Sequence, residues 1–153
     1  MRHHYIFTVS VDPQTAERRP VAEVLDEAEG RGTWIVSART RHVAELRDGD
    51  EVLFYVTGTN QTHARHIVAR ARVAGPATPI VNRHSQSWIG LTRPTHYEVP
   101  IREIVRFPEP IPLQDLVKEL GFIRNKESWG STLMGRITKI PAGDFEVILA
   151  RNR

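Results

Sequence analysis

Two stretches in the first half of the chain carry the clearest pattern of apolar and polar positions. Residues 52–56 form an unbroken run of β-branched, aliphatic and aromatic side chains, preceded by a turn-forming Asp-Gly-Asp sequence at 48–50 and closed by Gly58. Such a run is too short for a typical helix and predicts a buried strand. After a polar gap, residues 67–75 alternate and predict a second strand, which pairs with the first as a hairpin. We expect the second strand to place Ile67, Ala69, Ala71 and Val73 on one face.

Alternation elsewhere predicts further strands. Residues 4–11 alternate up to an Asp-Pro step, and residues 33–37 form a short extended segment. Residues 96–105 also read as a strand, in which Pro100 indicates an edge position or a bulge because proline lacks the N–H that a central ladder needs.

Helical spacing is present at two places. Residues 20–30 begin with a proline suited to a first helical position and carry apolar side chains at i, i+3, i+4 and i+7. The same spacing over residues 113–120 predicts a second helix, after a proline-rich bend at 107–112. The pattern at 144–149 fits either a last strand or a terminal helix. Strands mixed with a few short helices indicate an α+β domain built on a curved sheet.

Composition narrows the class of protein. A chain of 153 residues is the size of one domain, without cysteines for disulfides or thiolate chemistry and without the roughly 20-residue apolar run of a membrane helix. We therefore expect one domain over residues 1–153 that is soluble, cytoplasmic and monomeric, with no membrane partner. The net charge is +3, and 18 of the 21 basic residues are arginine, which binds phosphate in a bidentate manner. Coding bias explains such arginine enrichment equally well.

No pattern in the chain indicates catalysis or metal binding. The seven histidines lack the spacing of a metal site, and no cysteine, Gly-x-Ser-x-Gly elbow or glycine-rich phosphate loop is present. We therefore predict no catalytic residues, no metal and no cofactor.

Aromatic and basic side chains are the remaining candidates for function. Trp34, Trp88 and Trp129 lie in polar or glycine-containing surroundings, where stacking on a flipped or single-stranded base is worth ~1–3 kcal/mol per base. Ordinary core packing is the competing interpretation of each tryptophan, and a solvated surface charge that of each arginine. Candidates for contacts with a nucleic-acid backbone are Arg39, Arg41, Arg65, Arg83 and Arg93.

The order of several motifs resembles the EVE domain of the PUA-like superfamily. These are a tryptophan soon after the first helix, L-x-x-G-D-E-V-L-F-Y-V-T-G at 46–58, I-V-A-R-A-R-V-A-G at 67–75, and N-K-E-S-W-G at 125–130. The resemblance covers about residues 5–148 and implies a PUA-like curved sheet or pseudo-barrel with a few short helices packed on it. It also favours a helix at 144–149. Related ASCH domains carry a Gly-x-Lys-x-x-Glu pattern where this chain has Asp-Gly-Asp-Glu, so their enzymatic activities are not implied.

The same resemblance implies a base pocket. Gly32-Thr33-Trp34 matches the step that supplies a cage tryptophan in the related YTH readers of methylated adenine, and Trp88 lies in the loop comparable to that of a second cage residue. Ile35 replaces a small polar residue of the YTH pattern, so methyladenine specificity is not carried over. The EVE segment at 125–130 is implied to line the same cavity. The predicted pocket comprises Trp34, Trp88, Asn125, Lys126, Trp129 and Gly130.

These observations lead to three hypotheses about function. The first is a non-catalytic module that binds DNA or RNA and accepts a modified nucleobase in an aromatic-lined pocket. The second is a small hydrolase or nuclease that acts on a nucleotide or modified nucleoside in the same pocket, and the third is a pocket for a free small metabolite. The chain shows no catalytic nucleophile paired with a general base, and this absence favours the first hypothesis.

Overall fold

Strands are the commonest secondary structure in the part of the chain that the computed structural model describes, which is residues 2–9, 21–37, 40–57, 64–80, 96–124, 126–127, 129, 133 and 137–151. The elements are β1 (His4–Val9), α1 (Val21–Arg31), β2 (Thr33–Ser37), the 3-10 turn η1 (Val43–Glu45), β3 (Glu51–Val56), β4 (His66–Val73), β5 (Thr78–Ile80), β6 (His96–Pro112), the 3-10 turn η3 (Leu113–Leu116), β7 (Ile137–Ile140) and α2 (Ala142–Ala150).

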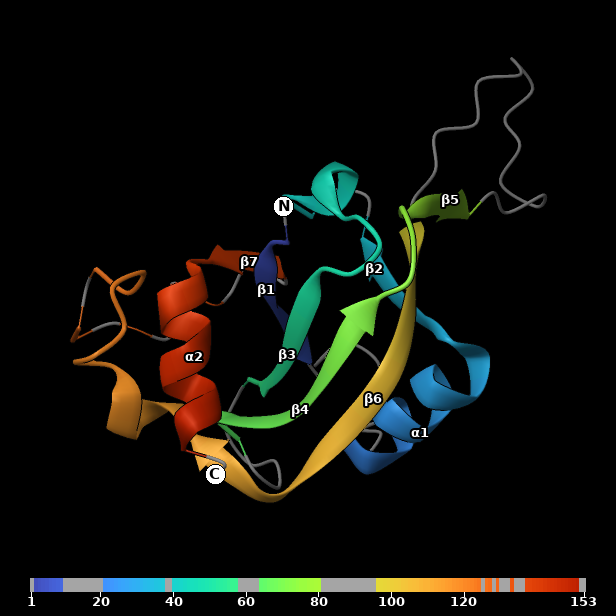
Figure 1. The fold of residues 1–153 in the computed structure, drawn as a ribbon. Coiled ribbons are helices and arrows are strands. Elements are labelled where there is room, and N and C mark those ends of the chain that lie inside the picture. Colours follow the sequence, from blue (N-terminus) through green and yellow to red (C-terminus); the bar gives the residue numbers. More distant parts are fainter. Residues whose placement is uncertain are drawn as a thin grey trace.

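The strands form one mixed, curled sheet (Figure 1). Within the described residues the order is β2-β6-β4-β3-β1-β7, with β5 also paired to β6. The β1–β3 pair is parallel and the other described pairs are antiparallel. Helix α1 lies beside β2 and β6, whereas α2 lies on the opposite side of the molecule, near β1 and β3 (Figure 1). The α+β, PUA-like fold predicted from the sequence is confirmed.

Two hydrophobic clusters lie on the two faces of this sheet. The first, which we name the Trp34 core, includes Trp34 of β2, Phe54 of β3 and Phe7 of β1. Because it joins β2 and β1, which are far apart in the strand order, it fills the inside of the curl. The second, which we name the Trp129 core, includes Tyr55 of β3, Trp129 and side chains of α2. Strand β3 is buried along its whole length because it contributes to both cores.

The predicted hairpin is present as β3 and β4, but one face assignment was wrong. Phe54 is paired with Ala69 and Tyr55 with Ile67, so Val68 is an extra residue that bulges β4. Ala69 therefore packs in the Trp34 core, as Phe54 does, while Ile67 packs in the Trp129 core. A bulge shifts the alternation of side chains by one residue, which a strict period of two does not anticipate.

The strand predicted over residues 96–105 extends further than its sequence indicated. Strand β6 runs through to Pro112, so the predicted proline-rich bend lies within the strand, and β6 is central, so Pro100 does not mark an edge. Pro108 and Pro110 are tolerated because of a local gap in pairing. Residues 107–110 of β6 face only Val68 of β4, and Pro100 uses its carbonyl to accept the Ala74 N–H at 2.8 Å.

The helix expected over residues 113–120 is reduced to the 3-10 turn η3. Its predicted apolar side chains are nevertheless all buried in the Trp129 core. The chain then turns at Gly121 and Phe122, whose backbone N–H groups donate to the Asp144 carboxylate at 3.1 and 2.9 Å. Asp144 belongs to α2, so the predicted C-terminal helix is confirmed and its third residue holds the preceding turn in place.

Candidate functional site

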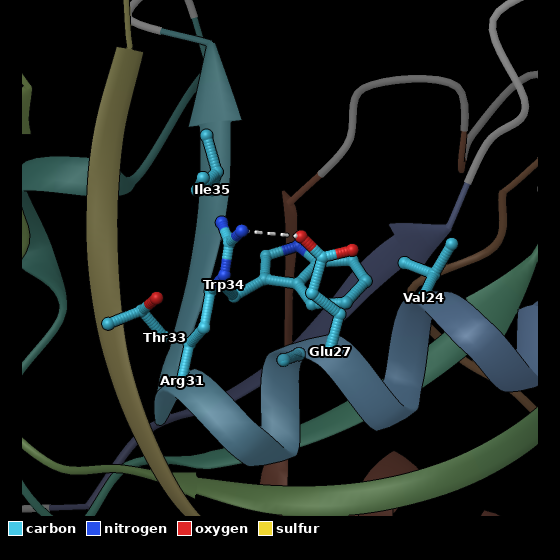
Figure 2. Close-up of a pocket in the computed structure, with 7 residues that line it drawn as sticks. Val24, Glu27, Arg31, Thr33, Trp34 and Ile35 are labelled. Carbon is cyan, nitrogen blue, oxygen red and sulfur yellow. Dashed lines mark ion pairs between the residues drawn. The ribbon is translucent and has the colours of Figure 1, made fainter.

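A pocket of about 210 Å³ lies between helix α1 and strand β2 (Figure 2). Helix α1 supplies one wall and β2 the other, and the residues that line the pocket are Val24, Glu27, Ala28, Arg31, Thr33, Trp34 and Ile35. This volume is below the ~300–1,000 Å³ typical of pockets for drug-sized ligands. It therefore suits a single planar ring better than a whole nucleotide.

A tight turn places the helix directly over the strand. Helix α1 ends at Arg31, and Gly32 follows with a left-handed φ of 68°, which a side-chain-bearing residue adopts only with strain. The Gly32 N–H donates to the Ala28 carbonyl at 2.8 Å, and the Gly32 carbonyl accepts from the Ile101 N–H of β6 at 3.0 Å. These bonds anchor the turn to both the helix and the sheet, so Trp34 emerges beneath α1.

The Trp34 indole forms a rigid wall of this pocket. It is only 8% exposed, and its ring centroid lies 4.9 Å from that of Phe54, with the planes tilted by 55°. Phe54 in turn packs edge-to-face on Phe7 at 6.0 Å. An aromatic side chain held from behind in this manner loses little further conformational freedom when a ligand stacks on it.

The charged side chains in the pocket lining are Glu27 and Arg31. They are one helical turn apart and form an ion pair of 3.0 Å, which Figure 2 shows in front of Trp34. The Glu27 side chain is 32% exposed and that of Arg31 63% exposed. The remaining lining is apolar apart from Thr33, so the polar side-chain groups of the pocket are those of Glu27, Arg31 and Thr33.

A second group of predicted site residues lies on the other face of the sheet. Trp129 is 7% exposed and packs edge-to-face on Tyr55, with centroids 6.3 Å apart. The Arg65 guanidinium carbon lies 5.6 Å from the Trp129 ring centroid, a cation–π arrangement. Lys126 donates to the Leu120 carbonyl at 2.6 Å. Burial raises the pKa of the Tyr55 phenol above its ordinary value.

Trp34 and Trp129 are not brought together. Their aromatic neighbours, Phe54 and Tyr55, are consecutive in β3, and consecutive side chains of a strand point to opposite faces. The structure thus joins Arg65 and Lys126 to the surroundings of Trp129, and separates all three from the pocket at Trp34. Arg41 is exposed in the segment before η1. The other predicted site residues, Trp88, Asn125, Gly130, Arg39, Arg83 and Arg93, lie outside the described residues.

Sequence reasoning missed the Glu27–Arg31 ion pair and the buried carboxylate of Glu51. Glu27 and Arg31 share the apolar face of α1 with Val24 and Ala28, a relation that their i, i+4 spacing would have indicated. Glu51 is 3% exposed, and its carboxylate accepts from a set of guanidinium groups. These belong to Arg2 at 3.5 Å, Arg70 at 3.0 Å and Arg72 at 3.1 Å.

The described part of the chain contains no cluster of three His, Asp or Glu side chains suited to a metal ion. Among the same residues, no helix has the length and apolar character required to span a bilayer.

Comparison with known families identifies the chain. The EVE domain matches residues 14–151, which is most of the sequence. The protein belongs to the EVE domain family. This confirms the resemblance inferred from the ordered motifs. A comparison with curated proteins gave no match.

Solved structures share the EVE fold with this chain at low sequence identity. Human THYN1, in a complex with DNA that contains 5-methylcytosine, is 12% identical with a TM-score of 0.65, and the match covers 99% of this chain and 98% of that one. A hypothetical protein from Leishmania major is 16% identical with a TM-score of 0.62, over 99% and 95% of the two chains. The N-terminal domain of McrB from Staphylothermus marinus is 12% identical with a TM-score of 0.58, over 97% and 93%.

Proposed function

We propose that this EVE domain binds nucleic acid that carries a modified base, and holds that base against Trp34 in the pocket between α1 and β2 without catalysing a reaction. The observation that carries the proposal is the buried, rigid Trp34 indole on the wall of a pocket sized for one ring. Membership of the EVE family and the similarity to THYN1, whose structure contains 5-methylcytosine DNA, support it.

The energetics of base insertion agree with such a pocket. Extruding a base costs a few kcal/mol in a duplex and less when the base is already unpaired. Stacking on an aromatic face returns ~1–3 kcal/mol, and apolar walls such as Val24 and Ile35 add burial of the ring edge. Trp88 is the sequence-based candidate for a second stacking wall.

Phosphate contacts would supply the rest of the affinity. The chain has a net charge of +3, and its candidate phosphate ligands are Arg39, Arg41, Arg83 and Arg93. Each contact releases counterions, so the affinity for an oligonucleotide should fall steeply with salt, and the loss of one arginine should flatten that dependence by about one unit of slope. Trp129 is not part of this pocket, because it lies on the opposite face of the sheet from Trp34.

A binding screen on Trp34 variants tests the proposal. Single-stranded oligonucleotides with one unmodified, methylated or hydroxymethylated base are titrated by fluorescence polarisation, with free nucleosides as competitors. Trp34→Ala should weaken the best oligonucleotide by about ten- to a hundredfold, whereas Trp34→Phe keeps a stacking ring and should retain most of the affinity. Trp129→Ala is the matched control for Trp34→Ala, since Trp129 is equally buried in the other core.

Thermal melting of each variant precedes these titrations, because Trp34→Ala also removes core volume. The proposal is refuted if the parent protein binds none of the oligonucleotides, whichever base modification they carry. It is also refuted if folded Trp34→Ala protein binds as tightly as the parent. Free nucleosides that bind as well as oligonucleotides would assign the pocket to a small metabolite. Cleavage of the oligonucleotide during the incubation would show that the protein is an enzyme.

A further inference from the structure

A group of arginines surrounds the buried carboxylate of Glu51. The guanidinium nitrogens of Arg2, Arg70 and Arg72 approach this carboxylate to 3.5, 3.0 and 3.1 Å. The Glu51 side chain is 4% exposed, whereas the three arginine side chains are exposed to between 32% and 54%. The carboxylate therefore lies beneath the guanidinium groups, and these groups form the surface above it.

This surface lies on the face of the sheet opposite the pocket at Trp34. Arg70 and Arg72 alternate along β4 with two side chains that pack in the Trp34 core, those of Ala69 and Ala71. A ligand held by the two guanidinium groups is therefore a different ligand group from one that stacks on Trp34.

Strand pairing fixes the positions of these arginines. Arg72 is paired with Glu51 across the β3–β4 ladder, and the His3 carbonyl accepts the Glu51 N–H at 2.9 Å, which places Arg2 beside the same carboxylate. Arg72 is also paired directly with Arg102 of β6. Like charges at directly opposite positions of a ladder repel and destabilise it. An anion bound above these side chains would relieve that repulsion.

Two exposed carboxylates offset this positive charge only in part. Glu103 lies 3.2 Å from Arg72, and Asp48 lies 2.9 Å from Arg102. Both carboxylate side chains are more than half exposed, so solvent weakens these ion pairs and an incoming anion displaces them at little cost. Together with Glu51 they are three carboxylates against four arginines, so the surface keeps an excess of positive charge.

The guanidinium groups also retain hydrogen-bond donors for a ligand. Glu51 accepts from Nη1 of Arg2, Nη2 of Arg70 and Nε of Arg72, which is one nitrogen of each group. A guanidinium presents its N–H groups as a rigid fork, and the oxygens of a phosphate group match that fork as acceptors. Because Glu51 already holds the three groups in place, a phosphate that binds to them costs little further side-chain freedom.

We propose that Arg2, Arg70 and Arg72 form a binding site for a phosphate group, which Glu51 organises from beneath. This site does not depend on the proposed function, because it lies on the other face of the sheet from Trp34. Inorganic phosphate and the phosphodiester backbone of a nucleic acid share the chemistry that the site recognises, and the experiments below separate these two sources.

Inorganic phosphate tests the site directly. The arginine Nε–H resonances of the protein are followed by NMR while phosphate replaces chloride at constant ionic strength, and Arg→Gln variants assign them. The resonances of Arg70 and Arg72 should shift in a saturable manner. The resonance of Arg151, which forms an exposed pair with Asp115, should not shift.

Arg2→Gln and Arg151→Gln form a matched pair of variants. Both arginine side chains are 54% exposed, so each substitution removes one charge with little effect on folding. Arg2→Gln should weaken the binding of the phosphate-bearing probe by about ten- to a hundredfold, because it removes charge-assisted hydrogen bonds. Arg151→Gln should change that binding by less than about twofold.

An oligomer of abasic deoxyribose phosphates separates the two sources. It carries phosphodiesters but no base, so the pocket at Trp34 does not contribute to its binding. If the nucleic-acid backbone is the ligand, this oligomer should shift the Arg70 and Arg72 resonances, and Arg2→Gln should lower the slope of its salt dependence by about one unit. If inorganic phosphate is the ligand, phosphate alone should shift them.

Two results would overturn the inference. One is that neither probe shifts the Arg70 and Arg72 resonances. The other is that Arg2→Gln and Arg151→Gln weaken binding equally, which would indicate a non-specific attraction to the net positive charge. Both results leave the proposed function intact, because that function is tested with bases and with Trp34 variants, and a failure to bind bases would leave this phosphate site intact in turn.

Discussion

Single buried polar residues differ sharply in how well their hydrogen-bonding groups are satisfied. Asp50 is 1% exposed and accepts from the His3 N–H and the Arg47 N–H, both at 3.0 Å. The hydroxyl of Tyr5, a side chain that is 0% exposed, has no hydrogen-bond partner in the described structure. Desolvation of a polar group without compensation costs about 1–3 kcal/mol. Asp50 therefore stabilises its turn, whereas the Tyr5 hydroxyl opposes folding.

Replacing Tyr5 by Phe should consequently stabilise the protein. Tyr5→Phe keeps the ring in the Trp34 core and removes the unpaired hydroxyl, so the free energy of unfolding should rise by about 1 kcal/mol. Urea denaturation at pH 7 measures this difference. A loss of stability of more than 1 kcal/mol would show that the hydroxyl is hydrogen-bonded in solution.

The same variant should change the response to alkali. Burial raises the pKa of Tyr5 from its ordinary 10.0 to about 12, so the folded state holds a proton that the unfolded state releases. The Tyr5 phenol therefore leaves the free energy of unfolding unchanged with pH below about pH 10, and lowers it progressively as the pH rises from 10 towards 12. The parent should therefore lose stability over this range more steeply than Tyr5→Phe, by on the order of 2 kcal/mol. Parallel pH profiles would contradict the raised pKa.

Backbone conformation at Glu103 makes a separate prediction at the residue scale. Glu103 has a left-handed φ of 55° at a bulge of β6, which costs a side-chain-bearing residue about 1–2 kcal/mol. Glu103→Gly should therefore be more stable than Glu103→Ala by about 1 kcal/mol in thermal unfolding, although both lose the ion pair with Arg72. At Glu98, also in β6 but without a positive φ, the order should reverse.

At the scale of elements, the β3–β4 pair is held by charge as well as by its ladder. Glu51 of β3 is nearly inaccessible, and Arg70 and Arg72 of β4 reach it from the neighbouring strand. A buried carboxylate left without its partners is strongly destabilising, whereas exposed ion pairs contribute little. This cluster therefore favours the observed register of the hairpin over a slipped one.

A double-mutant cycle measures that contribution. The cycle of Glu51→Gln and Arg72→Met should give a coupling free energy of about 1 kcal/mol or more in urea denaturation. The same cycle on the exposed pair Arg151 and Asp115, whose atoms are 3.8 Å apart, should give less than about 0.5 kcal/mol. Equal coupling in the two cycles would mean that Glu51 is solvated in the native state.

The molecule as a whole has two cores that share the strands β1, β3, β4, β6 and β7, and β3 is buried along its whole length. Strand β3 gives Val52, Phe54 and Val56 to the Trp34 core, and Leu53 and Tyr55 to the Trp129 core. Neither core can lose β3 without exposing the other. We therefore predict that the two cores unfold in one cooperative transition, as expected of a single domain.

Single-tryptophan variants test this cooperativity. One variant keeps Trp34 and carries Trp88→Phe and Trp129→Phe, and the other keeps Trp129 and carries Trp34→Phe and Trp88→Phe. When each is followed by both its fluorescence and its far-UV circular dichroism in urea, the two midpoints should coincide within each variant. Fluorescence that changes at a different urea concentration from the circular dichroism would reveal two independent units.

The sequence alone determined the local elements and the family. The apolar run at 52–56 and the stripe of α1 predicted the hairpin and the first helix, because periodicity and turn residues act over a few neighbouring positions. The EVE fold came from the resemblance of the ordered motifs to that family. The Gly32 turn that delivers Trp34 to its pocket was likewise visible as a local motif.

Only the tertiary structure decided which faces and which tryptophans come together. The bulge at Val68 moved Ile67 to the other core. The proline-rich stretch of β6 remained extended because its residues 107–110 are unpaired and have only Val68 of β4 opposite them. Trp34 and Trp129 were separated because Phe54 and Tyr55, their neighbours in β3, point to opposite faces. Such relations depend on the pairing of strands distant in sequence, and no local pattern along the chain encodes that pairing.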